Sequence, residues 1–213
     1  DLIALPSGTS MAHMYVRSGE SWGARSFFED IERRGLVGSL LEQEEIDMLS
    51  GRSVEGGIVV QSRRGRAHIF EDADGRITYR VKGNDPFAYF NIPQIIDADI
   101  SLSLSSETTY PDGIQNLLQI FRSRRAGDIV VTTEKDVVFV SENDTHSTLV
   151  THGSLSREHA LVPICSSVSC NLDVMRSVDV FAWVMNLLGI EILHSLDGRF
   201  MPDVSLKRKE EAV

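Results

Sequence analysis

His152 is the residue of this sequence whose type and surroundings most directly suggest chemistry. It is followed by Gly153 and lies between an apolar, strand-like run at 128–140 and another apolar run at 160–164. A neutral imidazole is a common metal ligand, and this context predicts a ring presented on a tight loop at the edge of a sheet. One histidine is not a metal site, so the other interpretation is a turn histidine with a structural hydrogen bond.

Other histidines lie near it in the sequence without a metal-ligand pattern. His146, His159 and His194 have no spacing that would place them around one ion. His13 falls on one face of a strand-like run at 11–16, where we expect a histidine that is satisfied within the core or at a sheet edge. From these residues alone we assign no catalytic residue.

The composition is that of an ordinary globular protein with one sizeable core. The 213 residues are 42% apolar and 24% charged, and the formal net charge is −10. A field of this sign repels the phosphates of duplex nucleic acid, so a phosphate-ester ligand would require a metal or a local basic cluster. No stretch has the length of a membrane span. Cys165 and Cys170 match neither a metal site nor a disulfide framework, and we expect both to be buried.

The first quarter of the chain predicts a mixture of short strands and helices. Residues 1–5 are expected to form a buried strand and 11–16 a second strand, followed by an amphipathic helix at 25–34. Two shorter segments follow, for which we predict a strand at 36–41 and a helix at 43–49.

Three strand-like runs at 58–60, 67–70 and 77–81 predict an antiparallel meander. The Asp-Ala-Asp-Gly turn at 72–75 is not followed by the Glu that a calcium loop requires, so we expect a hairpin turn. The basic run at 63–66 could receive an anionic substrate, and a solvated hairpin tip is the other interpretation.

The second half of the chain predicts two helices and a hairpin: helices at 114–125 and 178–190, and strands 128–131 and 137–140. Asp179, at the start of the last helix, can cap it, and Asp85 before a proline is expected to cap a further short helix. The strand at 129–131 is apolar on both sides, which predicts that it is covered on both faces.

A series of motifs in the C-terminal part of the chain carries a family resemblance. Thr-His-Gly-Ser at 151–154 precedes Val-Pro-Ile at 162–164, then Val-Asp-Val at 178–180, Leu-Leu-Gly-Ile at 187–190 and Asp-Gly-Arg at 197–199. In this order, the chain resembles the C-terminal end of the alkaline phosphatase superfamily, and within it the type I phosphodiesterase/nucleotide pyrophosphatase branch. The opening strands of the chain are also similar to core strands of such enzymes.

The resemblance implies an α/β fold, namely part of an alkaline-phosphatase-like three-layer α/β/α core with an inserted antiparallel β-meander. It divides the chain into core strands at 1–20, an inserted α+β subdomain with the meander at 21–110, the C-terminal part of the core at 111–206 and a tail at 207–213. The chain departs from the family at Ala182-Trp183, where members often carry Pro-Thr.

Enzymes of this superfamily use two zinc ions, held by Asp and His residues, and a Thr or Ser nucleophile that attacks phosphorus between them. By position, His152 matches the last zinc-ligating histidine. Arg157 and His159 are the candidate substrate-binding residues, with loop packing as the other interpretation for His159. The Asp-His-Gly motif of the family is not in this sequence, and the nucleophile and remaining ligands would precede Asp1.

The chain is therefore expected to be a C-terminal fragment that is inactive and holds no zinc by itself. Its expected partners are the N-terminal half of the same protein and, in the intact enzyme, a phosphate-ester small molecule, and the fragment alone could self-associate. One alternative is a non-catalytic binding domain that uses the meander at 56–81 as its working surface. Another is a sulfatase-like or phosphoglycerate-mutase-like relative, which the shared C-terminal motifs do not exclude.

Overall fold

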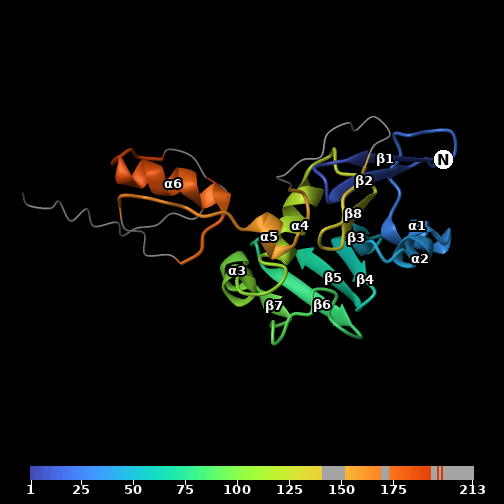
Figure 1. Ribbon diagram of the computed structural model, residues 1–213, viewed down its shortest axis with the longest axis horizontal. Coiled ribbons are helices and arrows are strands. Elements are labelled where there is room, and N and C mark those ends of the chain that lie inside the picture. Colours follow the sequence, from blue (N-terminus) through green and yellow to red (C-terminus); the bar gives the residue numbers. More distant parts are fainter. Residues whose placement is uncertain (141–151, 169–172, 193–195, 197, 199–213) are drawn as a thin grey trace, which may run out of the picture. The chain divides into compact units, whose positions relative to one another are not determined.

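Eight strands form one antiparallel sheet in the first of two compact units, Asp1–Val162 and Pro163–Val213, of the computed structural model (Figure 1). The structure describes residues 1–140, 152–168, 173–192, 196 and 198. Within this part of the chain, no helix combines the length and apolarity needed to cross a membrane.

The strand order in the sheet is β1-β2-β8-β3-β4-β5-β6-β7. The strands are β1 Leu2–Pro6, β2 Met11–Val16, β3 Ile46–Arg52, β4 Ile58–Ser62, β5 Arg66–Glu71, β6 Ile77–Lys82, β7 Ile95–Ile96 and β8 Ile129–Thr133. Strand β8 lies between β2 and β3, and both of these strands come from the first quarter of the sequence. Segments that are distant in the sequence are therefore neighbours in the sheet. The predicted mixed α/β class is confirmed, and the sheet joins strands from all of the predicted divisions up to residue 133.

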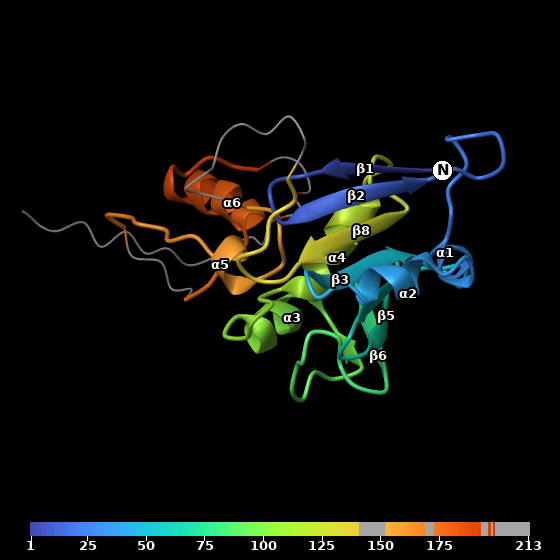
Figure 2. The same cartoon turned by 45° about the vertical axis from the view of Figure 1, so that its right-hand side comes forward.

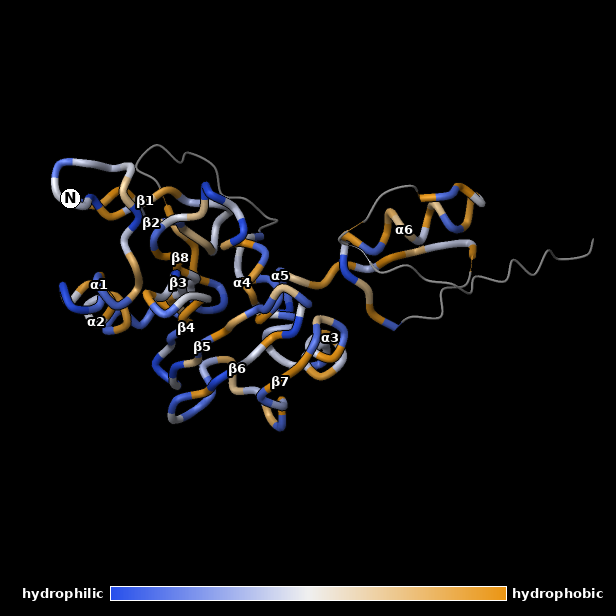
Figure 3. The backbone as a smooth tube through the Cα atoms, turned by 180° about the vertical axis from the view of Figure 1, so that it is seen from behind, coloured by the Kyte–Doolittle hydropathy of each residue, from blue (hydrophilic) through white to orange (hydrophobic). Residues whose placement is uncertain are grey.

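Helices cover both faces of this sheet (Figure 2). On one face, α1 Phe28–Arg33 and α2 Leu36–Leu41 pack against a cluster that includes Ile129 and Val131 of β8. On the other face, α4 Gly113–Arg122 packs against a cluster that includes Val130, and α3 Ala98–Ser105 lies next to α4. The whole of β8 is buried, and its hydrophobic run lies between β2 and β3 (Figure 3), which confirms the prediction of cover on both faces.

The predicted meander and its turn are confirmed. Strands β4, β5 and β6 pair in sequence order, and β5 pairs with β6 over six residues, from Arg66–Lys82 to Glu71–Ile77. At the tip between them, the Asp72 carboxylate accepts hydrogen bonds from the N–H groups of Asp74 (3.0 Å) and Arg76 (2.9 Å). Gly75 has φ +76°, a left-handed conformation that glycine adopts without steric cost.

The two short segments before the meander were predicted wrongly. Residues 36–41 form the helix α2 instead of a strand, directly after Gly35 with φ +81°. The predicted helix at 43–49 is largely replaced by β3, in which six of seven residues are buried. A central strand that is covered on both faces lacks the polar alternation that identifies a half-buried strand, and a short run of this kind resembles a buried helix.

Three further predictions are wrong for reasons of tertiary context. The strand β1 is exposed along its whole length because it is the outermost strand of the sheet. Residues 137–140 form no strand beside β8, and the Phe139 N–H donates instead to the Thr9 carbonyl (2.6 Å). Asp85 starts no helix, because its carboxylate accepts the N–H of Phe87 (2.8 Å) and the hydroxyl of Tyr79 (2.9 Å).

The second unit contains the predicted C-terminal helix, α6 Ser177–Leu187. Its cap is confirmed, since the Asp179 carboxylate accepts the N–H of Arg176 at 2.9 Å. Ala182 and Trp183 form the buried side of the helix. Cys165 is exposed, contrary to the prediction, and Cys170 lies outside the described residues.

Candidate functional site

His152 lies on the chain segment that contacts the turn between β1 and β2. The main-chain N–H of Thr9 in that turn donates to the His152 carbonyl at 3.0 Å. Gly8 approaches so closely that a Cβ added to it would lie 2.6 Å from Nδ1 of the ring. A Cβ at Gly153 would lie 2.6 Å from the Ser7 carbonyl oxygen, so both segments require glycine where their backbones meet.

The residue His152 is exposed, although its backbone is held in place. The turn that holds it follows the last residue of β1, Pro6, and precedes the first residue of β2, Met11. The structure thus places His152 on a loop beside a strand end, while its role as a metal ligand stays a prediction.

A metal site needs more than this ring. A catalytic zinc ion takes three protein ligands besides water or substrate. In the described ranges, no group of three or more His, Cys, Asp or Glu side chains is placed to hold a metal ion. His152 and its described neighbours thus do not fit a resident catalytic zinc by themselves. His146 and His194 lie outside the described residues.

Arg157, a predicted substrate-binding residue, is the first residue of the short helix α5 Arg157–Ala160. Its hydrogen bonds hold this helix against the segment between α3 and α4. Its guanidinium donates to the Ser106 carbonyl (2.6 Å) and to the Glu107 carboxylate (3.2 Å). Its main-chain N–H donates to the Thr109 carbonyl at 2.8 Å. These contacts give Arg157 a structural role in positioning the segment that contains His152, and contact with a substrate stays a prediction.

His159, the second predicted substrate-binding residue, pairs with a serine of the same segment. Its Nδ1 lies 2.7 Å from Oγ of Ser154, which in turn accepts the N–H of Ser156 at 3.1 Å. A serine beside a histidine can be an activated nucleophile. Here the same hydroxyl also accepts the N–H of Ser156, directly before α5. The hydrogen bond between Ser154 and His159 therefore agrees with the interpretation that His159 packs within this loop.

The basic run at 63–66 is partly exposed, but its arginines are paired with acids of the protein. Each of its three arginines forms an ion pair of 2.7 Å with an acid from another element: Arg63 with Glu134, Arg64 with Asp47 and Arg66 with Glu32. Arg63 also donates to the carbonyls of Gln43 and Ile46, at 2.9 and 2.8 Å. The run therefore ties the β4–β5 turn to the segments before β3 and after β8.

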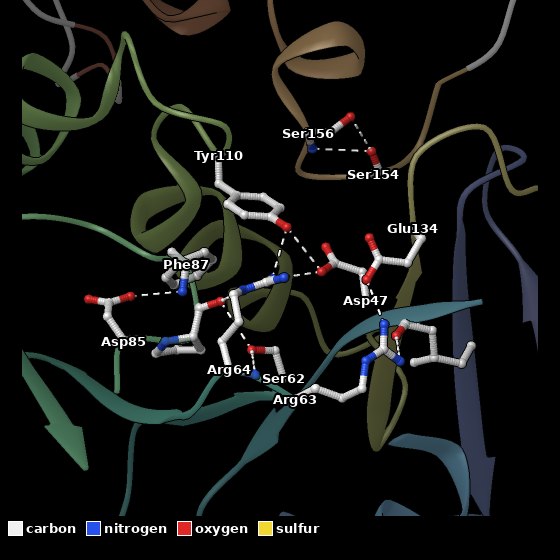
Figure 4. Close-up of polar contacts among 12 residues, drawn as sticks. Asp47, Ser62, Arg63, Arg64, Asp85, Phe87, Tyr110, Glu134, Ser154 and Ser156 are labelled. Carbon is white, nitrogen blue, oxygen red and sulfur yellow. Dashed lines mark hydrogen bonds and ion pairs between the residues drawn. The ribbon is translucent and has the colours of Figure 1, made fainter. Parts of the chain in front are cut away.

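Asp47 is the centre of a buried polar network that the sequence did not suggest (Figure 4). Only 5% of this residue is exposed, and its carboxylate accepts from Arg64 (2.7 Å) and from the Tyr110 hydroxyl (3.0 Å). Arg64 also donates to the Tyr110 oxygen and to the Pro86 carbonyl, each at 2.8 Å. Tyr110 is 63 residues from Asp47 in the sequence, so no local spacing could reveal the network.

The electrostatics of this network favour stability over proton transfer. Burial, together with the negative charge of Asp47, raises the pKa of Tyr110 far above its usual range. Burial opposes the charge of Arg64, but the hydrogen bond and charge of Asp47 raise the pKa of this guanidinium overall. Tyr110 thus remains protonated and Arg64 charged at neutral pH, and neither is suited to act as a base.

No protein-family model, no curated protein and no solved structure matches this chain. A functional assignment therefore depends on its residues and their geometry. Of the predicted site residues His152, Arg157 and His159, His152 is the exposed one, and its backbone is fixed beside a strand end.

Proposed function

We propose that this chain is the C-terminal part of a metal-dependent hydrolase that resembles type I phosphodiesterases and nucleotide pyrophosphatases of the alkaline phosphatase superfamily. In this proposal, His152 is one ligand of the metal centre. The single observation that carries it is the exposed residue His152, held beside the β1–β2 turn through the Thr9 hydrogen bond. A metal ligand needs a backbone that is fixed in place, and the contact that fixes His152 does not use its ring.

A comparison within the chain supports this interpretation. His13 is partly buried in β2, and its Nδ1 accepts the N–H of Gly127 at 3.0 Å, so this nitrogen has a structural task. His152 makes its contact with Thr9 through the main-chain carbonyl, which leaves the contact independent of the ring. Of these two histidines, His152 is the one that can bind a metal without breaking the hydrogen bond that orders its segment.

The remaining ligands and the nucleophile belong, in this proposal, to residues of the full-length protein outside these 213. Two bound zinc ions would neutralise phosphoryl oxygens and stabilise the leaving oxygen, which would also offset the net charge of −10. The chain alone is then inactive. Helices on both faces of the sheet support the three-layer α/β/α core that the proposal includes.

The test compares the full-length protein with its His152→Ala variant in hydrolysis of bis(p-nitrophenyl) phosphate, with zinc present and after chelation. We expect zinc-dependent hydrolysis that falls by more than about a hundredfold in the variant, since loss of even an outer-shell partner of a metal costs about 10- to 100-fold. The matched control is His68→Ala, because Nε2 of His68 contacts the Gly56 carbonyl (2.9 Å) in the meander.

Two results would overturn the proposal: hydrolysis that survives chelation and His152→Ala, or an equal loss in both histidine variants. A parallel assay with p-nitrophenyl sulfate separates the proposed activity from the sulfatase-like alternative, for which the sulfate ester would be the faster substrate.

A further inference from the structure

Two groups of arginines lie at opposite ends of the sheet, and they differ in their partners. The arginines of the basic run at 63–66, at the turn between β4 and β5, each pair with a carboxylate at 2.7 Å. The second group lies where β3 ends and β8 begins, and we call it the arginine cluster: Arg25, Arg52, Arg124 and Arg125. Within the described part of the chain, none of these four side chains forms an ion pair.

Arg52 is the fixed member of the arginine cluster. Its guanidinium donates to the main-chain carbonyls of Phe121 (2.7 Å) and Ser123 (2.8 Å) at the end of α4, and its Cζ lies 5.1 Å from the centroid of the Phe121 ring. Burial lowers the pKa of Arg52 below its usual range, and the positive charge of Arg25 adds to this effect. Because arginine stays protonated in proteins, two positive charges lie near each other here.

The turn after α4 adds Arg124 and Arg125 beside this point. The Ala126 N–H donates to the Ser123 carbonyl (3.3 Å), and the Arg125 N–H donates to the Ser123 hydroxyl (3.1 Å). These bonds fix the turn through its main chain and through one serine hydroxyl. All of residues 122–125 are exposed, so the turn presents its two arginines to solvent.

Two acids near the arginine cluster already have partners. Both carboxylate oxygens of Asp128 accept main-chain N–H groups, from Val16 at 2.8 Å and from Ser26 at 3.0 Å. The carboxylate of Glu71 pairs with Arg122 at 2.7 and 2.8 Å. The cluster therefore combines four guanidinium groups without a carboxylate of their own, in a chain whose net charge is −10. Such a concentration of like charge is stabilised by an anion from outside.

We propose that the arginine cluster is a docking surface for a phosphorylated side chain of a partner protein. A guanidinium fork binds phosphate oxygens in bidentate geometry. A phosphorylated side chain carries about 1.5 to 2 negative charges and three strong acceptor oxygens, so one group can accept from more than one arginine. A carboxylate brings one charge and two oxygens, which matches four arginines less well.

Exposure and charge favour a phosphate that is carried by a protein. Arg25 and residues 122–125 are exposed, whereas small-molecule sites are concave and bury most of their ligand. The net charge of −10 repels a long polyanion such as a nucleic acid along the rest of the surface. A single phosphate group contacts the cluster alone and avoids this repulsion.

The arginine cluster is separate from His152. Ile129, at the start of β8, pairs with Gly51 beside the cluster, while Thr132 pairs with Met11, directly after the turn that holds His152. The three residue steps between these pairs span roughly 10 Å of strand. The inference therefore goes beyond the proposed function and does not depend on it.

The test titrates the peptide acetyl-Gly-Ala-phosphoserine-Ala-Gly-amide into the ¹⁵N-labelled protein and follows the chemical shifts of the amides. We expect saturable shifts at residues 25–26, 52 and 121–128, and none at 63–66, where the arginines are paired. A Kd on the order of 1 mM is expected at low ionic strength, and salt should weaken the binding. Inorganic phosphate should compete, and the unphosphorylated peptide should cause no shifts.

Arg124→Gln combined with Arg125→Gln should weaken this binding at least about tenfold, since hydrogen bonds between charged groups are lost. The matched control, Arg33→Gln with Arg80→Gln, removes the same charge from exposed positions on α1 and β6 and should leave the Kd within about twofold. Lysine at both 124 and 125 keeps the charge without the bidentate fork and should also weaken binding. All of these variants should melt within about 2 °C of the parent chain.

Four results would overturn the inference. One is the absence of shifts at residues 25–26, 52 and 121–128 at a peptide concentration of about 10 mM, ten times the expected Kd. Another is an equal loss of binding in the two pairs of glutamine variants, which would reflect net charge alone. If the same peptide with glutamate in place of phosphoserine binds equally well, the surface does not recognise phosphate. If oligothymidylate binds more tightly with the same shifts, the surface belongs to a nucleic acid.

Discussion

The main-chain carbonyl of His152 accepts a 3.0 Å hydrogen bond from the main-chain N–H of Thr9, 143 residues earlier in the chain. The Thr9 hydroxyl lies 3.4 Å from the same carbonyl. Together they fix the backbone of the histidine segment beside the end of β1 and leave the residue exposed. The proposed metal-binding role depends on this contact, because a ligand on a mobile segment could not hold its place in a metal centre.

Gly8→Ala should displace the His152 segment. Gly8 has φ +78°, and an added Cβ would lie 2.5 Å from the His152 carbonyl oxygen. The matched control is Gly75→Ala, because Gly75 has φ +76° with nothing within 4 Å of an added Cβ. The left-handed conformation costs each variant roughly 1–2 kcal/mol, and urea denaturation should show a larger loss for Gly8→Ala. Equal losses in the two variants would show that the close approach to His152 contributes nothing.

Ser154→Ala should lower the free energy of unfolding by about 1 kcal/mol, the usual contribution of a hydrogen bond. The Ser154 hydroxyl contacts both Nδ1 of His159 (2.7 Å) and the N–H of Ser156 (3.1 Å). His159→Asn should be more stable than His159→Ala, because its side-chain amide can both donate and accept and so can replace Nδ1 as the hydrogen-bond partner of the Ser154 hydroxyl. Identical stability of the two His159 variants contradicts this view. A raised KM in full-length His159→Asn, at normal stability, would support the predicted contact with substrate.

Asp47→Ala should destabilise the chain by about 3–5 kcal/mol, because it leaves the partly buried Arg64 guanidinium without its carboxylate. Tyr110→Phe keeps that ion pair and should cost only about 1 kcal/mol. As a control, Glu134→Ala removes the carboxylate that pairs with Arg63. The side chains of this ion pair are more exposed than Asp47, 37% for Glu134 and 41% for Arg63, so the loss should be about 1 kcal/mol or less. Urea denaturation measures all three. If Asp47→Ala cost no more than Glu134→Ala, the network would not be the structural element described above.

His13 should make stability depend on pH. Burial lowers its pKa below the usual range, so near pH 6 the unfolded state binds protons more readily than the folded state. The free energy of unfolding should therefore fall as the pH drops from about 7.5 to 5.5 through the ordinary histidine pKa of about 6.5. His13→Gln can still accept the Gly127 N–H but does not titrate, so its stability should fall less over this range. Parallel curves for the two proteins would exclude His13 as the cause.

The elements with clear periodic patterns could be predicted from the sequence. The apolar residues of β2 alternate, with Ala12, Met14 and Val16 buried, and α4 has a stripe that includes Ile114 and Leu117. The β3 strand could not be identified in this way, because its apolar and polar residues are buried alike and do not alternate. The partners of β8 could not be predicted either, since β2 and β3 are distant in the sequence and the nearby segment 137–140 was the local candidate.

The candidate site was predicted in part. The Gly153 next to His152 indicated a tight loop, and Gly153 has φ +112°. The contact of this loop with Gly8 and Thr9 could not be deduced, because Thr9 and His152 are 143 residues apart in the sequence. The ion pairs of the basic run could not be deduced, because its acidic partners lie on α1 (Glu32), on β3 (Asp47) and directly after β8 (Glu134).

Zinc content measured by mass spectrometry after dialysis against zinc-buffered solution is the most direct test of the central claim that His152 is one ligand of a metal centre completed elsewhere. We expect bound zinc in the full-length protein, its loss in His152→Ala, and no zinc retained by the 213-residue chain, because one imidazole lacks the two further ligands of a catalytic site. Stoichiometric zinc in the 213-residue chain that His152→Ala removes would contradict the incomplete site. Full zinc content in the full-length His152→Ala protein would contradict the ligand itself.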